Sequence, residues 1–144
     1  MIEFYLPTPL PSLNVRQRKH WAQLRREQER LGWEVLAAIG GSRYLPRPPY
    51  GRARVEIVRR SIRLLDTDNS WASAKPLVDV LCIASKRHPR ALGIITDDDP
   101  AHCELVVTQE RCERGKGSTF VRITPLSIST NLTTHESERA IRCK

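Results

Sequence analysis

Residues 54–70 read Arg54-Val55-Glu56-Ile57-Val58-Arg59-Arg60-Ser61-Ile62-Arg63-Leu64-Leu65-Asp66-Thr67-Asp68-Asn69-Ser70. Charged and apolar residues partly alternate at the start of this stretch, which predicts a half-buried strand. The strand is expected to continue through Ile62 and Leu64 to Asp66. Asp66 and Asp68 are one residue apart, a spacing that puts both side chains on the same face of a strand. We therefore expect a pair of carboxylates at a strand end, directly before a helix.

That helix is predicted to begin after Asp68-Asn69-Ser70, because all three residue types are favoured at the N-cap. Apolar residues three and four apart mark its buried side. Pro76 lies inside the segment and must either occupy the first turn or kink the helix, since proline lacks a backbone N–H. The start of the regular helix is therefore placed between Ser70 and Lys75.

A longer helical pattern runs from about Arg16 to Ile39. Its largely apolar stripe consists of Trp21, Leu24, Gln28, Leu31, Val35 and Ala38. Gly40-Gly41-Ser42 ends this helix, because glycine adopts the left-handed conformation at low cost. Trp21 and Trp33 are interpreted as core or interface residues, with base stacking as the alternative.

Three further segments have the composition of short strands. They are residues 2–6, 104–110 and 119–123, the last two joined by a hairpin-like turn. These elements predict an α/β (α+β) fold in one domain, a small mixed sheet flanked by two main helices. The domain is expected over residues 1–126. Residues 127–144 are rich in Ser, Thr and Asn without periodicity and are predicted to be a disordered tail.

Charge is distributed unevenly along the 144 residues, which carry a net charge of +8. Residues 1–65 hold 13 Lys and Arg against 5 Glu and no Asp, whereas residues 66–144 hold 11 basic against 11 acidic residues. All six aspartates lie between Asp66 and Asp99. A basic half beside a carboxylate-bearing half suits a polyanionic partner held at a metal ion. The alternative is a solvated basic surface.

Other bulk features define the expected setting. No apolar run approaches the ~20 residues that span a bilayer, and the N-terminal residues lack the features of a secretory signal. We therefore expect a cytoplasmic protein with no membrane partner. The four cysteines show no zinc-like spacing and are predicted to be free, mostly buried thiols.

The two aspartate clusters predict a site for a hard divalent cation. Neighbouring carboxylates such as Asp66 and Asp68 repel one another unless a cation lies between them. Carboxylate oxygens suit Mg²⁺, with Mn²⁺ as a substitute. The segment Asp97-Asp98-Asp99 is expected to complete the site from a second element. In extended backbone Asp97 and Asp99 would face one way and Asp98 the other, and which of them binds the ion stays open.

A metal site of this kind hydrolyses phosphodiesters by lowering the pKa of bound water and neutralising developing charge. A lysine near the carboxylates stabilises the charge of the transition state, and Lys75 is the candidate. It follows Asp68 by seven residues, about two helical turns, which would keep both on one side of the helix. The alternatives are a helix cap for Asp66 to Asn69 and a solvated loop for Asp97 to Pro100.

In order along residues 3–124, these motifs resemble the RusA-like Holliday junction resolvases, which are small, often prophage-encoded endodeoxyribonucleases. The matching segments are Pro11-Ser12-Leu13-Asn14, Lys19-His20, Leu65-Asp66-Thr67-Asp68-Asn69, Lys75, Asp79-Val80-Leu81 and Gly93-Ile94-Ile95-Thr96-Asp97-Asp98. The resemblance implies a homodimer of mixed α/β fold with a basic DNA-binding surface. It also implies Mg²⁺-dependent paired nicking of four-way DNA junctions in recombination and repair.

Carried over by position, the catalytic and metal-binding carboxylates are Asp66, Asp68 and Asp98, and the catalytic lysine is Lys75. A stiff proline-rich loop leads into a basic cluster that can grip phosphates, or serves only as a connector. We assign four residues of this region to DNA binding, Asn14, Arg16, Arg18 and Lys19.

Three hypotheses arise from the sequence. The first is a structure-selective, Mg²⁺-dependent endodeoxyribonuclease that resolves Holliday junctions. The second is a DNA-binding module of the same fold without the reaction, motivated by the six residues between Asp68 and Lys75 and by Pro76. The third is a nuclease for other branched DNA.

Overall fold

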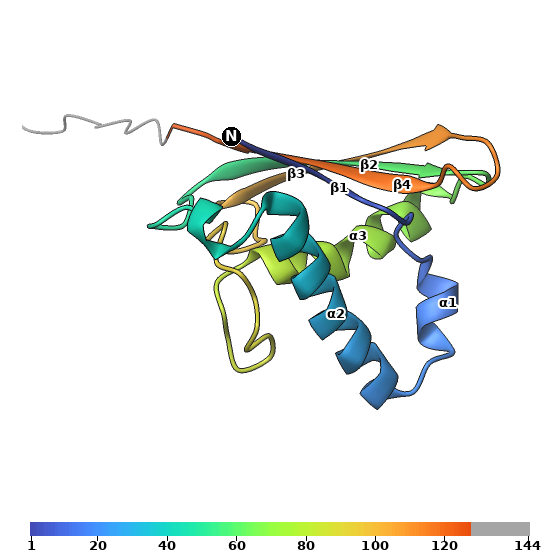
Figure 1. Cartoon of the computed structure of the whole chain (residues 1–144), viewed down its shortest axis with the longest axis horizontal. Helices are drawn as coiled ribbons and strands as arrows, with labels where there is room; N and C mark the ends of the chain where they lie inside the picture. Colours follow the sequence, from blue (N-terminus) through green and yellow to red (C-terminus); the bar gives the residue numbers. More distant parts are fainter. Residues whose placement is uncertain (128–144) are drawn as a thin grey trace, which may run out of the picture.

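Residues 1–127, the part of the chain that the computed structural model describes, form a mixed four-stranded sheet with the helices packed on one of its faces (Figure 1). This arrangement confirms the predicted α/β class. In chain order the elements are β1 (Ile2–Leu6), α1 (Leu13–Gln17), α2 (Trp21–Ile39), the 3-10 turn η1 (Ser42–Tyr44), β2 (Ala53–Ser61), α3 (Thr67–Leu81), β3 (Cys103–Arg111) and β4 (Ser118–Pro125).

The sheet order is β1-β4-β2-β3, with β4 antiparallel to both neighbours and β3 parallel to β2. The predicted hairpin between the last two strands is therefore wrong, because β2 lies between them. The connection crosses the end of β2, where Arg60 pairs with Glu110 on one side and Ser118 on the other. The crossing is close: a Cβ on Gly117 would lie 3.0 Å from the side chain of Pro9.

Alternation along β2 positions the core. Val55 and Ile57 are fully buried and pair with Ile123 and Val121 of β4, so both strands present apolar side chains to the helices. The intervening residues point to the open face of the sheet, where charged cross-strand pairs such as Arg54–Glu104 form, with 2.8 Å between nitrogen and oxygen. The period-two pattern therefore predicted this strand correctly over its first part.

Strand β2 ends at Ser61 and does not reach Asp66, which corrects the predicted boundary. Arg59 supplies a physical reason. Its buried guanidinium donates from Nε to the carbonyl of Leu10, 2.8 Å away, and from Nη1 to that of Arg63, 3.1 Å away. The chain is therefore drawn back toward Arg59 just after the strand, and Asp66 lies beyond the sheet.

The helix predicted from Arg16 to Ile39 is divided in two. The break lies before α2, whose N-cap His20 accepts a hydrogen bond at Nδ1 from the amide of Ala22, 3.3 Å away. Gly40 has φ of 97° and ends α2 in the left-handed conformation, as its position predicted. Trp21 and Trp33 of α2 are 67% and 65% exposed, so the prediction that they could serve as core residues is wrong.

Helix α3 begins at Thr67, earlier than the sequence pattern indicated. Its N-cap is Asp66, not one of the three residues that follow Thr67. Pro76 lies well inside the helix and is buried, so it does not occupy the first turn. The carbonyl of Pro76 also accepts a hydrogen bond from Nε2 of Gln28, 2.7 Å away, which links α3 to α2.

Two further expectations concern membrane-spanning segments and cysteine thiols. None of the helices within residues 1–127 combines the length and apolar character needed to cross a membrane. Cys82, Cys103 and Cys112 are free thiols, of which Cys103 is buried and the other two are half-buried. The predicted tail begins at residue 127, and residues 128–144 lie outside the described part of the chain.

The alternation in β2 predicts different costs for two isoleucine truncations. Ile57→Ala removes a fully buried side chain and is expected to lower the free energy of unfolding by about 2–5 kcal/mol. Ile62→Ala, beyond the strand and 52% exposed, is expected to change it by less than about 0.5 kcal/mol. Urea unfolding followed by circular dichroism measures both, and equal losses would contradict the assigned orientation of the strand.

Candidate functional site

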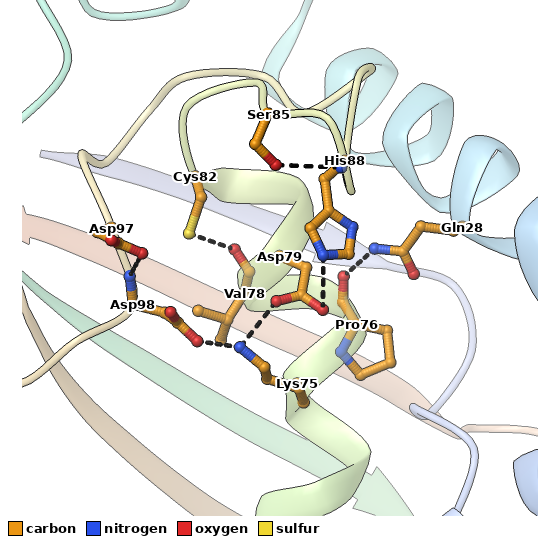
Figure 2. A network of polar contacts seen from close by, with 10 residues as sticks. All are labelled: Gln28, Lys75, Pro76, Val78, Asp79, Cys82, Ser85, His88, Asp97 and Asp98. Atoms are coloured by element: carbon orange, nitrogen blue, oxygen red, sulfur yellow. Dashed lines mark hydrogen bonds and ion pairs between the residues drawn. The ribbon is translucent and has the colours of Figure 1, made fainter.

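Lys75 and Asp98 meet in the structure although 23 residues separate them (Figure 2). Nζ of Lys75, on the exposed side of α3, makes an ion pair with Oδ2 of Asp98 and a second with Oδ1 of Asp79, 2.9 Å away. Asp79 also lies 3.8 Å from Nε2 of His88. The lysine and acid assigned from the motif order are therefore neighbours in space.

Hydrogen bonds to the end of α3 explain this meeting. The last carbonyls of a helix have no partner within the helix. Here the returning chain supplies partners, with the amides of Leu92 and Gly93 donating to Val80 and Cys82 at 2.7 and 2.9 Å. Ile94 donates in the same way to Leu81 at 2.8 Å and is fully buried. The aspartates that follow are thereby fixed beside the C-terminal half of α3.

The three consecutive aspartates have different surroundings. Asp98 faces Lys75, and Oδ1 of Asp97 accepts the backbone N–H of Asp98 at 2.8 Å. Asp99 instead accepts the amides of Ala101 and His102 at 2.7 and 3.1 Å, and its Oδ2 lies 2.8 Å from Nδ1 of His102. The expected alternation is wrong, because this segment is a turn before β3 and not extended backbone. Asp97 and Asp98 lie on the same side.

The Lys75–Asp98 pair keeps both groups ionised. The hydrogen bond from Lys75 lowers the pKa of Asp98 and outweighs its partial burial. Burial alone would lower the pKa of Lys75, but hydrogen bonds to Asp98 and Asp79 raise it above the ordinary lysine value. The site thus holds a permanent positive charge between two carboxylates at neutral pH.

Asp66 and Asp68 lie elsewhere on α3. Asp66 is its N-cap, accepting the amide of Asn69 at Oδ1 and the side-chain nitrogen of Asn69 at Oδ2, both at 2.8 Å. Asp68 is exposed in the first turn. Seven residues of helix separate it from Lys75, a rise of about 10 Å, and the amine of Lys75 is held by groups farther along the helix. The structure therefore brings Lys75 and Asp98 together but not Asp66 or Asp68, whose expected placement on a strand is wrong.

Within residues 1–127, only Cys82, Asp97 and Asp98 bring three potential ligand atoms within 4.8 Å of one another. Burial first, and then the neighbouring carboxylates, raise the pKa of the Cys82 thiol to about 12, and its Sγ donates to the carbonyl of Val78 at 3.3 Å. A protonated thiol is a poor ligand for a hard cation. The carboxylate oxygens of Asp97 and Asp98 are therefore the only hard donor atoms of this cluster.

These groups line a cleft of about 410 Å³, which we call the Lys75 cleft. Its residues are Lys75, Asp79, Cys82, Ile83, Ala84, Ser85, Arg87, His88, Thr96, Asp97 and Asp98. Sequence reasoning did not assign Asp79 or Cys82 to the site. Their spacing of four and seven residues from Lys75 places all three along one side of α3, and this is the signal that could have identified them.

The predicted DNA-binding residues lie on and just after α1. Asn14 and Arg18 are exposed, and Arg16 is half-buried between two clefts on either side of α2. Lys19 is engaged within the chain, because its Nζ lies 2.6 Å from Oε1 of Glu27. The loop before α1 is fastened to Thr119, whose hydroxyl accepts the amide of Leu10 and donates to the carbonyl of Thr8, so it also serves as a connector.

Comparisons of this chain with protein-family models, with curated proteins and with solved structures find no match.

The N-cap at Asp66 gives a stability prediction. Asp66→Ala removes an acceptor from the first turn of α3 and is expected to lower the free energy of unfolding by about 0.5–2 kcal/mol. Asp68→Ala, which removes a neighbouring carboxylate of the same turn that is not the N-cap, serves as the control. Urea unfolding without divalent cations measures both. A smaller loss for Asp66→Ala than for Asp68→Ala would exclude the cap.

The ion pair at Asp98 gives a pH prediction. A carboxyl whose pKa is lower in the folded state stabilises the protein fully above its unfolded pKa of about 3.9. That stabilisation is lost as the pH falls through the folded value. The difference in unfolding free energy between the parent chain and Asp98→Asn is therefore expected to be constant near neutrality and to shrink below about pH 4. A difference that grows on acidification would contradict the pairing.

Proposed function

We propose that this chain is a Mg²⁺-dependent, structure-selective endodeoxyribonuclease that resolves four-way Holliday junctions by paired phosphodiester hydrolysis. It would act in the cytoplasm as a homodimer, in DNA recombination and repair. One observation carries the proposal: Lys75 and Asp98, assigned from motif order alone, meet in one cleft beside a second carboxylate, Asp97. The net charge of +8 supports a polyanionic substrate.

The residues have separate roles in this proposal. Asp97 and Asp98 hold the ion, which when bound lowers the pKa of a water ligand and neutralises phosphate charge. Lys75 supplies a further positive charge for the transition state. Asp79 keeps Lys75 in the Lys75 cleft through its own contact of 2.9 Å, so the lysine stays positioned when Asp98 binds another cation.

This ligand set differs from the one that the resemblance implies. Asp97 joins Asp98, while Asp66 serves α3 as its N-cap and Asp68 lies about two turns from Lys75. The same separation favours a second candidate function, a DNA-binding module of this fold without the reaction. In that case Lys75, Asp79 and Asp98 act as a structural ion-pair network.

The cleavage of a synthetic four-way junction in Mg²⁺ tests the proposal. Asp98→Asn removes an ionised ligand and is expected to abolish cleavage, and Lys75→Met is expected to lower the rate constant by roughly 10²–10³-fold. Asp99→Asn is the matched control, because Asp99 faces His102 and an asparagine keeps one acceptor oxygen. It is expected to cleave at the parent rate.

The outcomes separate the candidate functions. If the chain binds the junction but forms no Mg²⁺-dependent product, the nuclease is excluded and the DNA-binding module without the reaction is favoured. Equal cleavage of junction, flap, fork and linear duplex would replace junction resolution with a less selective nuclease. Cleavage lost in Asp99→Asn and retained in Asp98→Asn would overturn the assignment of the site.

A further inference from the structure

A second cleft, of about 420 Å³, lies between α2 and the segment that follows α3. We call it the basic groove, because five basic side chains line it against two acidic ones. The basic residues are Arg16, Arg25, Lys86, Arg87 and Arg90, and the acidic residues are Glu29 and Asp79. Its walls also include apolar surface from Leu24 and Val80.

Most of this positive charge is not neutralised within the described chain. Arg90 pairs with Glu29, with 3.1 Å between Nη1 and Oε2, and Asp79 pairs with Lys75. No ion pair within residues 1–127 involves the other four basic residues, Arg16, Arg25, Lys86 and Arg87. Like charges that converge on one concave surface attract an anion with several charges.

The basic groove continues into the Lys75 cleft. Asp79, Arg87 and His88 line both hollows, so the two share a wall along α3 and the loop after it. Figure 2 shows His88 and Gln28 on one side of Asp79 and the Lys75–Asp98 pair on the other. A ligand in the basic groove would therefore lie next to the Lys75 cleft.

Trp21 extends the same face of α2. It precedes Arg25 by four residues and Gln28 by seven, and both of these line the groove. Residues at that spacing lie above one another on a helix. Trp21 is 67% exposed, although burial is the usual state of so large an apolar side chain. Trp33 is similarly exposed at 65%, but twelve residues turn it about 120° away from Trp21.

We propose that the basic groove and Trp21 bind an unpaired DNA strand beside the phosphate to be cleaved. A positive groove with an exposed aromatic ring matches how single strands are bound, by phosphate contacts and base stacking. A cleft of about 420 Å³ has the volume of a small-ligand site, which is enough for part of one sugar-phosphate backbone. That the strand is DNA rests on the proposed function.

Tryptophan variants test the stacking. Binding of a fluorescent single-stranded oligonucleotide is measured by anisotropy in EDTA, so that no reaction is needed. Trp21→Ala is expected to weaken binding by about tenfold to a hundredfold, Trp21→Phe to retain most of it, and Trp33→Ala to leave it unchanged. Equal effects of Trp21→Ala and Trp33→Ala, or none from either, would overturn the role of Trp21. If Trp21→Ala weakens binding to duplex DNA as much as binding to the single strand, the preference for an unpaired strand is overturned.

Charge variants test the groove. Arg25→Gln/Arg87→Gln is compared with Arg52→Gln/Arg114→Gln, which removes two positive charges at exposed positions outside the groove. The groove variant is expected to reduce the slope of log affinity against log salt by about 1.4 for a single strand, and the control variant by none. Equal slopes for both variants would overturn the groove. If the parent chain cleaves no junction but the groove variant still reduces the salt slope, the proposed function is wrong and this inference stands. If the parent chain cleaves the junction but the groove variant leaves the salt slope unchanged, this inference is wrong and the proposed function stands.

Discussion

The hydrogen bonds between residues 92–95 and the last carbonyls of α3 are the constraint on which the candidate site depends. They join the amides of Leu92, Gly93 and Ile94 to carbonyls that the helix cannot satisfy itself. Burial of Ile94 and Ile95 in the core anchors the same segment. Because both ends of the intervening loop are fixed in this way, the Lys75 cleft and the basic groove are built on one helix terminus.

The two hollows differ in how their charges are balanced. In the Lys75 cleft the lysine lies between Asp98 and Asp79, and each carboxylate gains a cation within the chain. In the basic groove Arg25, Lys86 and Arg87 gain no such partner within the described residues. An ion entering the Lys75 cleft must compete with Lys75, whereas a phosphate entering the groove displaces no internal partner. A polyanion is therefore expected to bind more favourably in the basic groove than in the Lys75 cleft.

Local patterns in the sequence predicted the individual elements better than their arrangement. Alternation located β2, and Gly40 located the end of α2, because each depends on neighbouring residues alone. The hairpin prediction failed because a turn signal between two strands does not exclude insertion of a third, here β2. The exposure of Trp21 could not be predicted either, since a stripe at helical spacing does not show how far the sheet covers it.

Some residues of the candidate site could be predicted from the sequence, and others could not. The order of motifs predicted Lys75 and Asp98, which meet through the return of the chain to α3. Asp66 and Asp68 were placed on a strand because a D-x-D-N pattern suits both a strand end and a helix cap, and the cap formed. Which of three aspartates faces Lys75 depends on a turn in which one oxygen of Asp99 accepts the amides of Ala101 and His102. Side chains in a turn follow no regular period, so their directions cannot be predicted from a sequence pattern.

The placement of Asp68 also limits how the site can rearrange. Asp68 and Lys75 belong to one continuous helix, α3, so their separation along the axis is fixed by the rise of the helix at about 10 Å. A loop movement cannot shorten it; only unwinding of the buried segment through Ser73 and Ala74 would. A shared site for Asp68 and Asp98 within one chain would cost that packing. Asp97 requires no such change, because it already lies beside Asp98.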